Sequence, residues 1–159
     1  MDNYPYFNSG NNYYFTTQQG IIYTVEFYQT PELVHKDFAY LDIHSIVFFP
    51  DIDYAQRKVN RNLNKDELIS ATIIKIIEYF IAEYDCPILF VCDADDIEAM
   101  ARYRLFKSWY SCYEQNDLLV QFREYLTEST YYTGIIYNQN DPFAKQILEV
   151  LENPDILDK

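Results

Sequence analysis

The feature that most constrains this chain is the stretch 64–113, which has the pattern of a helix, a buried strand and a second helix joined by very short loops. Residues 88–91, Ile-Leu-Phe-Val, form an unbroken apolar run typical of a strand that is covered on both faces. Apolar residues at helical spacing precede and follow this run. They are Ile69, Ile73, Ile76, Ile77, Phe80 and Ile81 before it, and Ile97, Met100, Ala101, Leu105, Trp109 and Cys112 after it. The stretch therefore predicts a sheet with helices packed against it, the first helix beginning near Lys65.

The flanking segments predict further strands and a last helix. Aromatic and β-branched residues fill 13–17 and 21–28, and the turn residues between them indicate a hairpin. A third strand is expected at 43–49, a late strand at 131–137, and a helix from Asp141-Pro142. Segments 33–40 and 118–126 are ambiguous. The order β-β-β-α-β-α-β-α predicts an α+β fold with a mixed, mostly antiparallel sheet and helices on its faces.

Length and composition predict one compact domain. The chain has 159 residues, of which 49% are hydrophobic and 18% aromatic, which is ample material for a core. We expect a single domain over residues 1–159, with an ordered core at about 12–152 and frayed ends. No secretory leader and no apolar run of about 18 residues is found in the sequence, so we expect a cytoplasmic protein.

The charge balance bears on the kind of partner. Twelve Lys and Arg stand against 25 Asp and Glu, which gives a net charge of −13 and a negative field around the folded protein. Nucleic acids are repelled by such a field, because they are bound by neutralising their phosphates with clustered Lys and Arg. We expect no direct nucleic acid binding, and instead a protein partner, with a basic one among the options.

Two resemblances follow from the order and the motifs. The predicted elements over residues 13–137 resemble the GNAT N-acetyltransferase fold. Three motifs are similar to those of an uncharacterised family of small bacterial proteins: Ala-Thr-Ile-Ile-Lys-Ile-Ile at 71–77, Arg-Tyr-Arg-Leu-Phe-Lys-Ser-Trp at 102–109 and Asn-Asp-Pro at 140–142. The second resemblance covers most of the chain. It implies a shared architecture and assigns no activity.

The acetyltransferase resemblance also implies a cofactor site, which departs from the expected motif. Those enzymes hold the pyrophosphate of acetyl-CoA with a Q/R-x-x-G-x-G/A turn, whereas Val59 and Arg61 here stand at the positions of the small residues. If acetyl-CoA were bound nonetheless, the resemblance would imply basic residues at its phosphates and a tyrosine as the acid. The candidates are Arg57, Lys58, Arg61 and Lys65 for the phosphates, and Tyr103 or Tyr110 for the acid.

Metal and thiol chemistry receive little support from spacing. Asp93, Asp95 and Asp96 follow a predicted strand and are weak metal candidates, but capping of the next helix accounts for them. Neither His35 nor His44 has a Cys or carboxylate at a recognisable metal spacing, and we expect no metal. The three cysteines read as reduced core residues. A pair of Cys92 with His44 remains an alternative that folding would have to assemble.

The 17 tyrosines are the most unusual count, and many of them lie in the hairpin 13–28. One face of this hairpin must pack inward, and the other can expose rings beside Glu26, which suits a protein interface. The sequence favours a non-catalytic binding or interaction module without a cofactor. The alternatives are an acyl-CoA-dependent N-acyltransferase and an acidic inhibitor that mimics nucleic acid.

Overall fold

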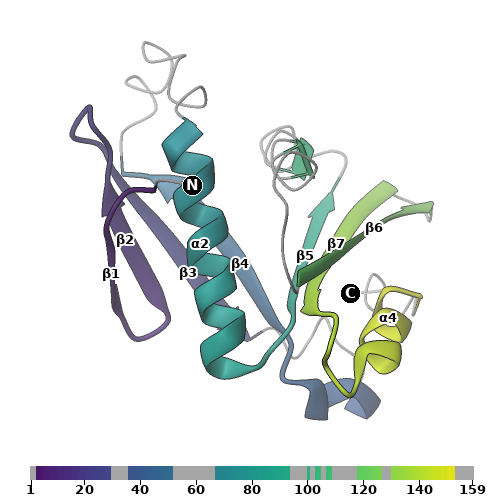
Figure 1. Cartoon of the computed structure of the whole chain (residues 1–159). Coiled ribbons are helices and arrows are strands. Elements are labelled where there is room, and N and C mark those ends of the chain that lie inside the picture. Colours follow the sequence, from purple (N-terminus) through teal and green to yellow (C-terminus); the bar gives the residue numbers. More distant parts are fainter. Residues whose placement is uncertain are drawn as a thin grey trace. The chain divides into compact units, whose positions relative to one another are not determined.

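The computed structural model describes residues 3–29, 36–51, 67–93, 100, 103–104, 107–108, 118–126 and 130–152. It shows an α+β protein with a mixed, mostly antiparallel arrangement of strands (Figure 1). The hydrogen-bonding order is β1-β2-β3-β4-β5-β7-β6, in which β4 and β5 are parallel. The strands are β1 (Tyr6–Ser9), β2 (Asn12–Thr16), β3 (Ile22–Gln29), β4 (His44–Pro50), β5 (Ile88–Asp93), β6 (Leu118–Leu126) and β7 (Thr130–Asn138). The helices are the 3-10 helix η2 (Lys36–Leu41) and the α-helices α2 (Glu67–Tyr84) and α4 (Ala144–Glu152).

The chain forms two compact units. The first consists of Met1–Tyr28 and Ile46–Glu83, and the second of Gln29–Ser45 and Tyr84–Lys159. Strand β4 contributes its first two residues to the second unit and the rest to the first. The expected single domain stays a prediction. Among the described residues, no helix is long and apolar enough to cross a membrane.

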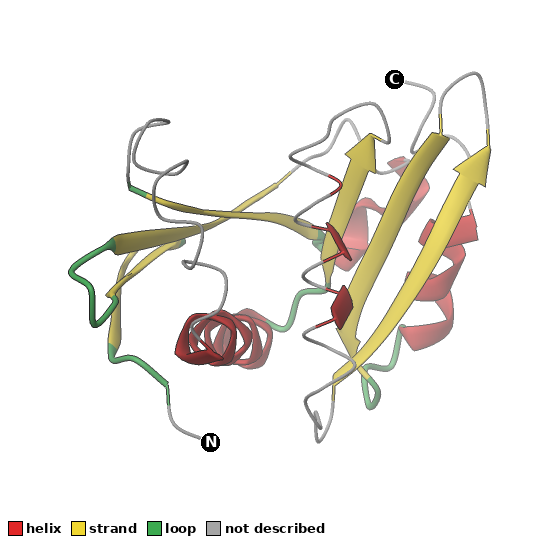
Figure 2. Ribbon diagram, turned by 90° about the horizontal axis from the view of Figure 1, so that it is seen from above, coloured by secondary structure: helices red, strands yellow, loops and turns green. Residues whose placement is uncertain are grey.

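In the first unit, α2 packs on the inner face of the hairpin strands (Figure 2). The apolar spacing read from the sequence is confirmed, because the isoleucines of α2 and Phe80 are buried. The rings of Phe27 and Phe80 stack at a centroid distance of 3.9 Å, and Tyr13 meets Phe80 edge-on at 6.5 Å. A hydrogen bond also joins α2 to the segment before β1: the hydroxyl oxygen of Thr72 accepts a hydrogen bond of 2.8 Å from the backbone N–H of Tyr4. Ring contacts and this hydrogen bond thus hold α2 against β2, β3 and the segment before β1.

In the second unit, the first three residues of β5, Ile88 to Phe90, are buried on both faces, as the apolar run predicted. Leu89 belongs to a core shared with η2, β7 and α4, formed by Leu41, Ile43, Leu89, Ile135, Tyr137, Ile147 and Val150. On the opposite face, the Phe90 ring lies over Gly134, its cross-strand neighbour, so closely that a Cβ at this glycine would overlap the ring. The alternation of strand residues therefore divides this unit into two packed layers.

Three segments differ from the expectation or resolve it. We expected residues 1–11 to be frayed, whereas β1 pairs with β2 and places Phe7 opposite Tyr14. The contact between these two rings stabilises the pairing of the short, uncharged strand β1 with β2. The ambiguous segment 33–40 gives η2 in its described part, and 118–126 is β6.

The second helix of the organising stretch is described only in part. Met100, Tyr103, Arg104, Lys107 and Ser108 are helical, and the residues between them lie outside the described ranges, as does the expected first turn before Glu67. The GNAT-like order therefore stays a prediction.

Candidate functional site

Most of the residues that the sequence nominated for a site lie outside the described ranges. This holds for Arg57, Lys58, Arg61, Lys65, Asp95, Asp96, Tyr110 and His35. Asp93 is the last residue of β5. The phosphate and acidic-cluster hypotheses thus stay predictions.

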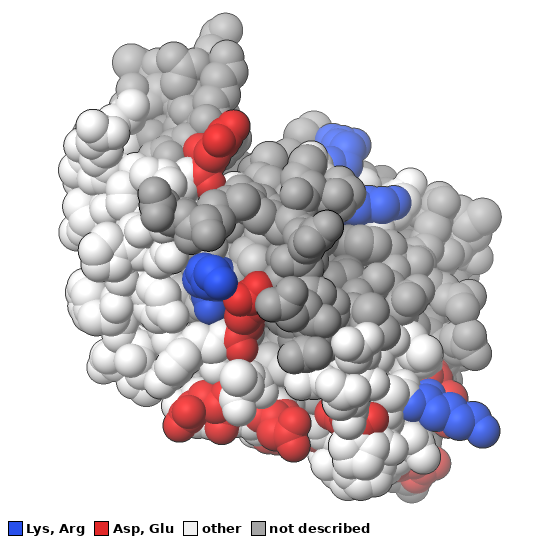
Figure 3. Space-filling model, in the orientation of Figure 1, with Lys and Arg blue, Asp and Glu red and all other residues white. Residues whose placement is uncertain are grey.

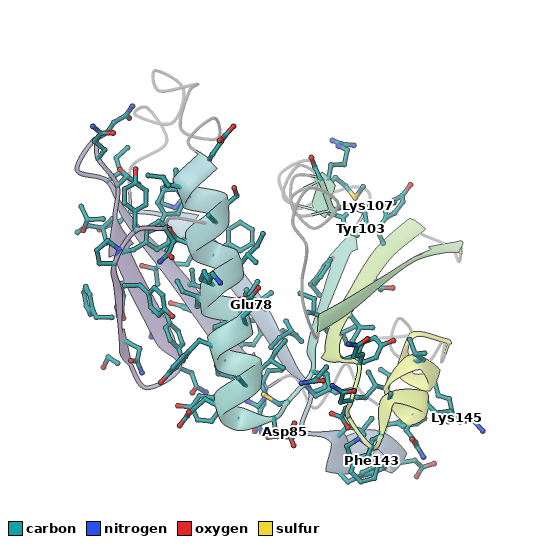
Figure 4. The ribbon with its side chains drawn as sticks, viewed as in Figure 1. Glu78, Asp85, Tyr103, Lys107, Phe143 and Lys145 are labelled. Atoms are coloured by element: carbon teal, nitrogen blue, oxygen red, sulfur yellow. The ribbon has the colours of Figure 1, made fainter. Side chains whose placement is uncertain are left out.

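Tyr103, the other candidate acid, is described and is only 5% exposed. Its ring lies 6.0 Å from that of Phe90 and 5.3 Å from that of Tyr132, in an aromatic cluster beside β5 (Figure 4). A general acid has to reach the group that it protonates. In this arrangement the ring serves packing, and a catalytic role for Tyr103 stays a prediction.

The first unit carries an exposed aromatic surface on the side of the hairpin strands that faces away from α2. We call it the outer aromatic face and define it by Phe7, Tyr14, Ile22, Glu26 and Tyr28. Side chains of a strand alternate between faces, and the pairing of Phe7 with Tyr14 and of Thr16 with Ile22 places them on one side. The opposite side chains are the buried Tyr13, Phe15, Tyr23, Val25 and Phe27. The outer aromatic face is therefore mounted on a rigid, fully packed layer.

The five residues that define this face include three aromatic rings and no Lys or Arg. Phe7 is 66% exposed and stacks on Tyr14 at a centroid distance of 5.4 Å. Between residues 3 and 29 the chain has one charged side chain, Glu26, and its first basic residue is Lys36. In the view of Figure 3, which shows the molecule from the side of α2, the surface over β1 and β2 at the left carries neither colour. Large exposed rings beside a carboxylate are suited to guanidinium and ammonium groups.

A second surface pair provides a useful contrast. Tyr40 of η2 and Phe143, just before α4, are both exposed, and their rings also lie 5.4 Å apart. Lys145 follows closely, and Figure 4 shows it at α4 near Phe143. Exposed, paired rings are therefore found on both surfaces. The two surfaces differ in that a lysine follows Phe143 closely, whereas no Lys or Arg is among the residues that define the outer aromatic face.

The second unit brings together a thiol, an imidazole and a carboxylate. One ligand atom each from Asp42, His44 and Cys86 lies within 4.8 Å of the others. His44 opens β4, and its backbone N–H donates a hydrogen bond of 3.0 Å to the carbonyl of Pro87. Because His44 is also paired with Ile88, the residues just before both strands meet at the same end of the parallel pair. We call this group the Asp42–His44–Cys86 cluster.

The backbone around the cluster is tightly specified. Two non-glycine residues with positive φ are found in the described part of the chain, Asp42 at 53° and Asp85 at 52°. Aspartate tolerates this left-handed region better than most residues. The ring atom Nδ1 of His44 lies 2.9 Å from the backbone carbonyl oxygen of Asp42, and Gln29 Nε2 donates a hydrogen bond of 2.6 Å to Asp42 Oδ1. Two of the three side chains are thus oriented by a second layer of contacts.

Burial determines the chemistry of the thiol. Cys86 is 1% exposed and His44 is 7% exposed, whereas Asp42 is open to solvent. Burial first of all, and the nearby carboxylates of Asp42 and Asp85 to a smaller degree, together raise the pKa of the Cys86 thiol to about 12. A thiol that stays protonated at neutral pH is a poor nucleophile. The raised pKa therefore argues against a role of Cys86 as a catalytic nucleophile.

Sequence reasoning missed this cluster. It weighed His44 with Cys92, but Cys92 lies near the far end of β5, where it is paired with Tyr132. The available signal was positional. If the strands 43–49 and 88–91 run parallel, their first residues lie side by side. Cys86, just before the strand 88–91, then comes close to His44 at the start of the strand 43–49.

Comparison with curated proteins and with solved structures found no match. One family model matches residues 65–153, a range that includes α2, β5, β6, β7 and α4 and exceeds half of the chain. The predicted resemblance to an uncharacterised family is thereby confirmed, and no activity comes with it. The chain belongs to the Family of unknown function (DUF6169).

Proposed function

We propose that this protein is a non-catalytic interaction module of the cytoplasm, whose outer aromatic face binds an arginine- or lysine-bearing segment of a basic partner protein. The observation that carries the proposal is the stacked pair of Phe7 and Tyr14, with Phe7 66% exposed, in a region without a single Lys or Arg.

Aromatic rings supply the contact area. Tyr and Phe are enriched at the centres of protein interfaces, because they bury much surface at a small cost in side-chain entropy. The outer aromatic face adds Ile22 and Tyr28, both exposed, to the Phe7–Tyr14 pair. The rigid layer of buried residues beneath it limits the reorganisation that binding would require.

Charge supplies the preference for a basic partner. A cation over the face of an exposed ring gains about 0.5–1 kcal/mol, and more when water is excluded. Glu26 provides a carboxylate beside the rings. The net charge of −13 would steer a basic partner toward the protein and increase its association rate. A buried free thiol at Cys86 agrees with the reducing environment of the cytoplasm.

The test is a binding measurement on the full chain with a defined probe. A fluorescein-labelled peptide of alternating arginine and glycine is titrated with the wild-type protein and with the variants Phe7→Ser and Tyr14→Ser, and anisotropy is recorded. Both variants keep the net charge. We expect each to weaken binding by about fivefold, which corresponds to the loss of one cation–ring contact.

The matched control is Phe143→Ser, which removes a ring that is also exposed, 45% against 66% for Phe7, from a pair with the same 5.4 Å spacing. It should leave the affinity unchanged. If all three variants bind the arginine peptide like the wild type, the attraction comes from net charge alone and the proposed function is wrong.

A further inference from the structure

We propose that the Asp42–His44–Cys86 cluster is a binding site for a divalent transition-metal ion of the Zn²⁺ type, with three protein ligands and a fourth position open to solvent.

The donor atoms match the ion. Zn²⁺ is bound in proteins by thiolate sulfur, imidazole nitrogen and carboxylate oxygen, and the cluster offers one of each. In a tetrahedral site with bonds of about 2.0–2.3 Å, neighbouring ligand atoms lie about 3.3–3.8 Å apart. The atoms here are within 4.8 Å of one another, so a movement of about an ångström closes the site. The exposed side chain of Asp42 has the freedom to make that movement.

Charge neutrality favours a doubly charged ion. On binding, the thiol of Cys86 transfers its proton to water and its sulfur forms a bond to the metal. The thiolate and the carboxylate of Asp42 then carry two negative charges, which the ion balances, while the imidazole stays neutral. A neutral assembly avoids the large cost of placing an unpaired charge beside buried groups such as His44 and Cys86.

The neighbouring groups orient the ligands as metal sites require. A carbonyl oxygen accepts hydrogen bonds only, so Nδ1 of a neutral His44 ring carries its proton toward the Asp42 carbonyl. The lone pair then resides on Nε2. Such a contact from histidine to a carbonyl is the usual way in which a protein sets the tautomer of a ligating ring. The amide of Gln29 holds the Asp42 carboxylate in the same manner.

The site would join two segments that are distant in sequence. Asp42 and His44 precede and open β4, and Cys86 precedes β5, and these two strands share only the register pairs His44–Ile88 and Ser45–Leu89. An ion bound here acts as a clamp at the start of a short parallel pair. Because it binds the folded state, it must raise the melting temperature of the protein.

The experiment is a titration of the full-length, chelator-treated protein with Co²⁺, which replaces Zn²⁺ and absorbs light. We expect a thiolate-to-cobalt charge-transfer band together with visible bands of a four-coordinate ion, saturating at one equivalent. Addition of Zn²⁺ should abolish these bands and raise the melting temperature. Cys86→Ser should remove the charge-transfer band, and His44→Gln should weaken binding by at least about tenfold.

A matched pair of variants separates ligation from local charge. Asp42→Asn and Asp85→Asn each remove one carboxylate at a left-handed position that asparagine also tolerates. Only Asp42 belongs to the cluster. We therefore expect weaker Co²⁺ binding in Asp42→Asn, by about tenfold, and a clearly smaller change in Asp85→Asn, which acts on Cys86 through its charge alone.

The proposal is overturned if the wild type gives no charge-transfer band under an excess of Co²⁺. It is also overturned if Cys86→Ser, shown by circular dichroism to be folded, retains the band, since the sulfur ligand would then lie elsewhere. Equal effects of Asp42→Asn and Asp85→Asn would reduce the role of Asp42 to general electrostatics and contradict its place among the ligands.

Discussion

The outer aromatic face and the Asp42–His44–Cys86 cluster are assembled in opposite ways. The first arises within one hairpin and its neighbouring strand, because side chains of a paired strand alternate between two faces. The second arises where two segments far apart in the chain are brought together by the parallel pairing of β4 and β5. The first is set by local order, and the second depends on a register that no local pattern reveals.

This difference predicts which substitutions will affect each site. A change to one exposed ring of the outer aromatic face should weaken binding and leave the fold intact, whereas a change in the packed layer beneath it should disturb the whole face. Among the described residues the cluster has three members, one for each ligand position, so a change to any of them should weaken binding.

The largest loss of stability is expected when a core side chain beneath the outer aromatic face is truncated. Phe80→Ala removes a ring that is 1% exposed and stacked on Phe27, and truncations of this kind cost about 3–5 kcal/mol. Urea unfolding followed by circular dichroism measures this loss. The variant should also bind the arginine peptide more weakly. A loss below about 1 kcal/mol would show that the stack contributes little.

A somewhat smaller effect is expected in the second unit. Gly134→Ala introduces a Cβ into the volume of the Phe90 ring, and overpacking of this kind costs about 1–3 kcal/mol. Urea unfolding again provides the measurement. Because Gly134 belongs to the second unit, the affinity for the arginine peptide should stay at the wild-type value in the folded variant. A change in that affinity would contradict the separation of the two sites.

In the chelator-treated, metal-free protein, the raised pKa of Cys86 predicts a pH dependence of stability. The thiol has an ordinary pKa of 9.0, and burial raises it to about 12 in the folded protein. The folded state therefore holds the proton more tightly than the unfolded state. The resulting stabilisation is fully present below about pH 9 and is lost as the pH rises toward 12. Cys86→Ser cannot lose a proton in this range, so the difference in unfolding free energy between wild type and variant should narrow above pH 9. A constant difference would show that burial does not hold this proton.

The smallest effect on stability is expected for Phe7→Ser. Phe7 is exposed and lies on a short first strand, so its loss should cost no more than about 0.5 kcal/mol, while peptide binding falls by about fivefold. Phe143→Ser should show an equally small loss of stability with no loss of binding. The two variants together separate the exposure of a ring from its function.

Much of the fold follows from the sequence, because burial imposes a period on the chain. The isoleucines of α2 recur at helical spacing, and the run at the start of β5 is apolar without interruption. The hairpin of β2 and β3 was equally visible. By contrast, the sequences of β1 and η2 show no hydrophobic period. These two elements are stabilised by contacts with other parts of the chain: Phe7 of β1 stacks on Tyr14, and Leu41 of η2 packs in the core with Leu89 and Ile147.

The candidate sites divide along the same line. By itself the sequence determined α2, the hairpin of β2 and β3, the start of β5 and the acidic balance, because these depend on periodicity and composition. Only the tertiary structure decided that Cys86, rather than Cys92, lies beside His44, and that Asp42 completes the group. The physical reason is that hydrogen bonding between β4 and β5 selects one register, and this register is set by long-range burial rather than by any short stretch of chain.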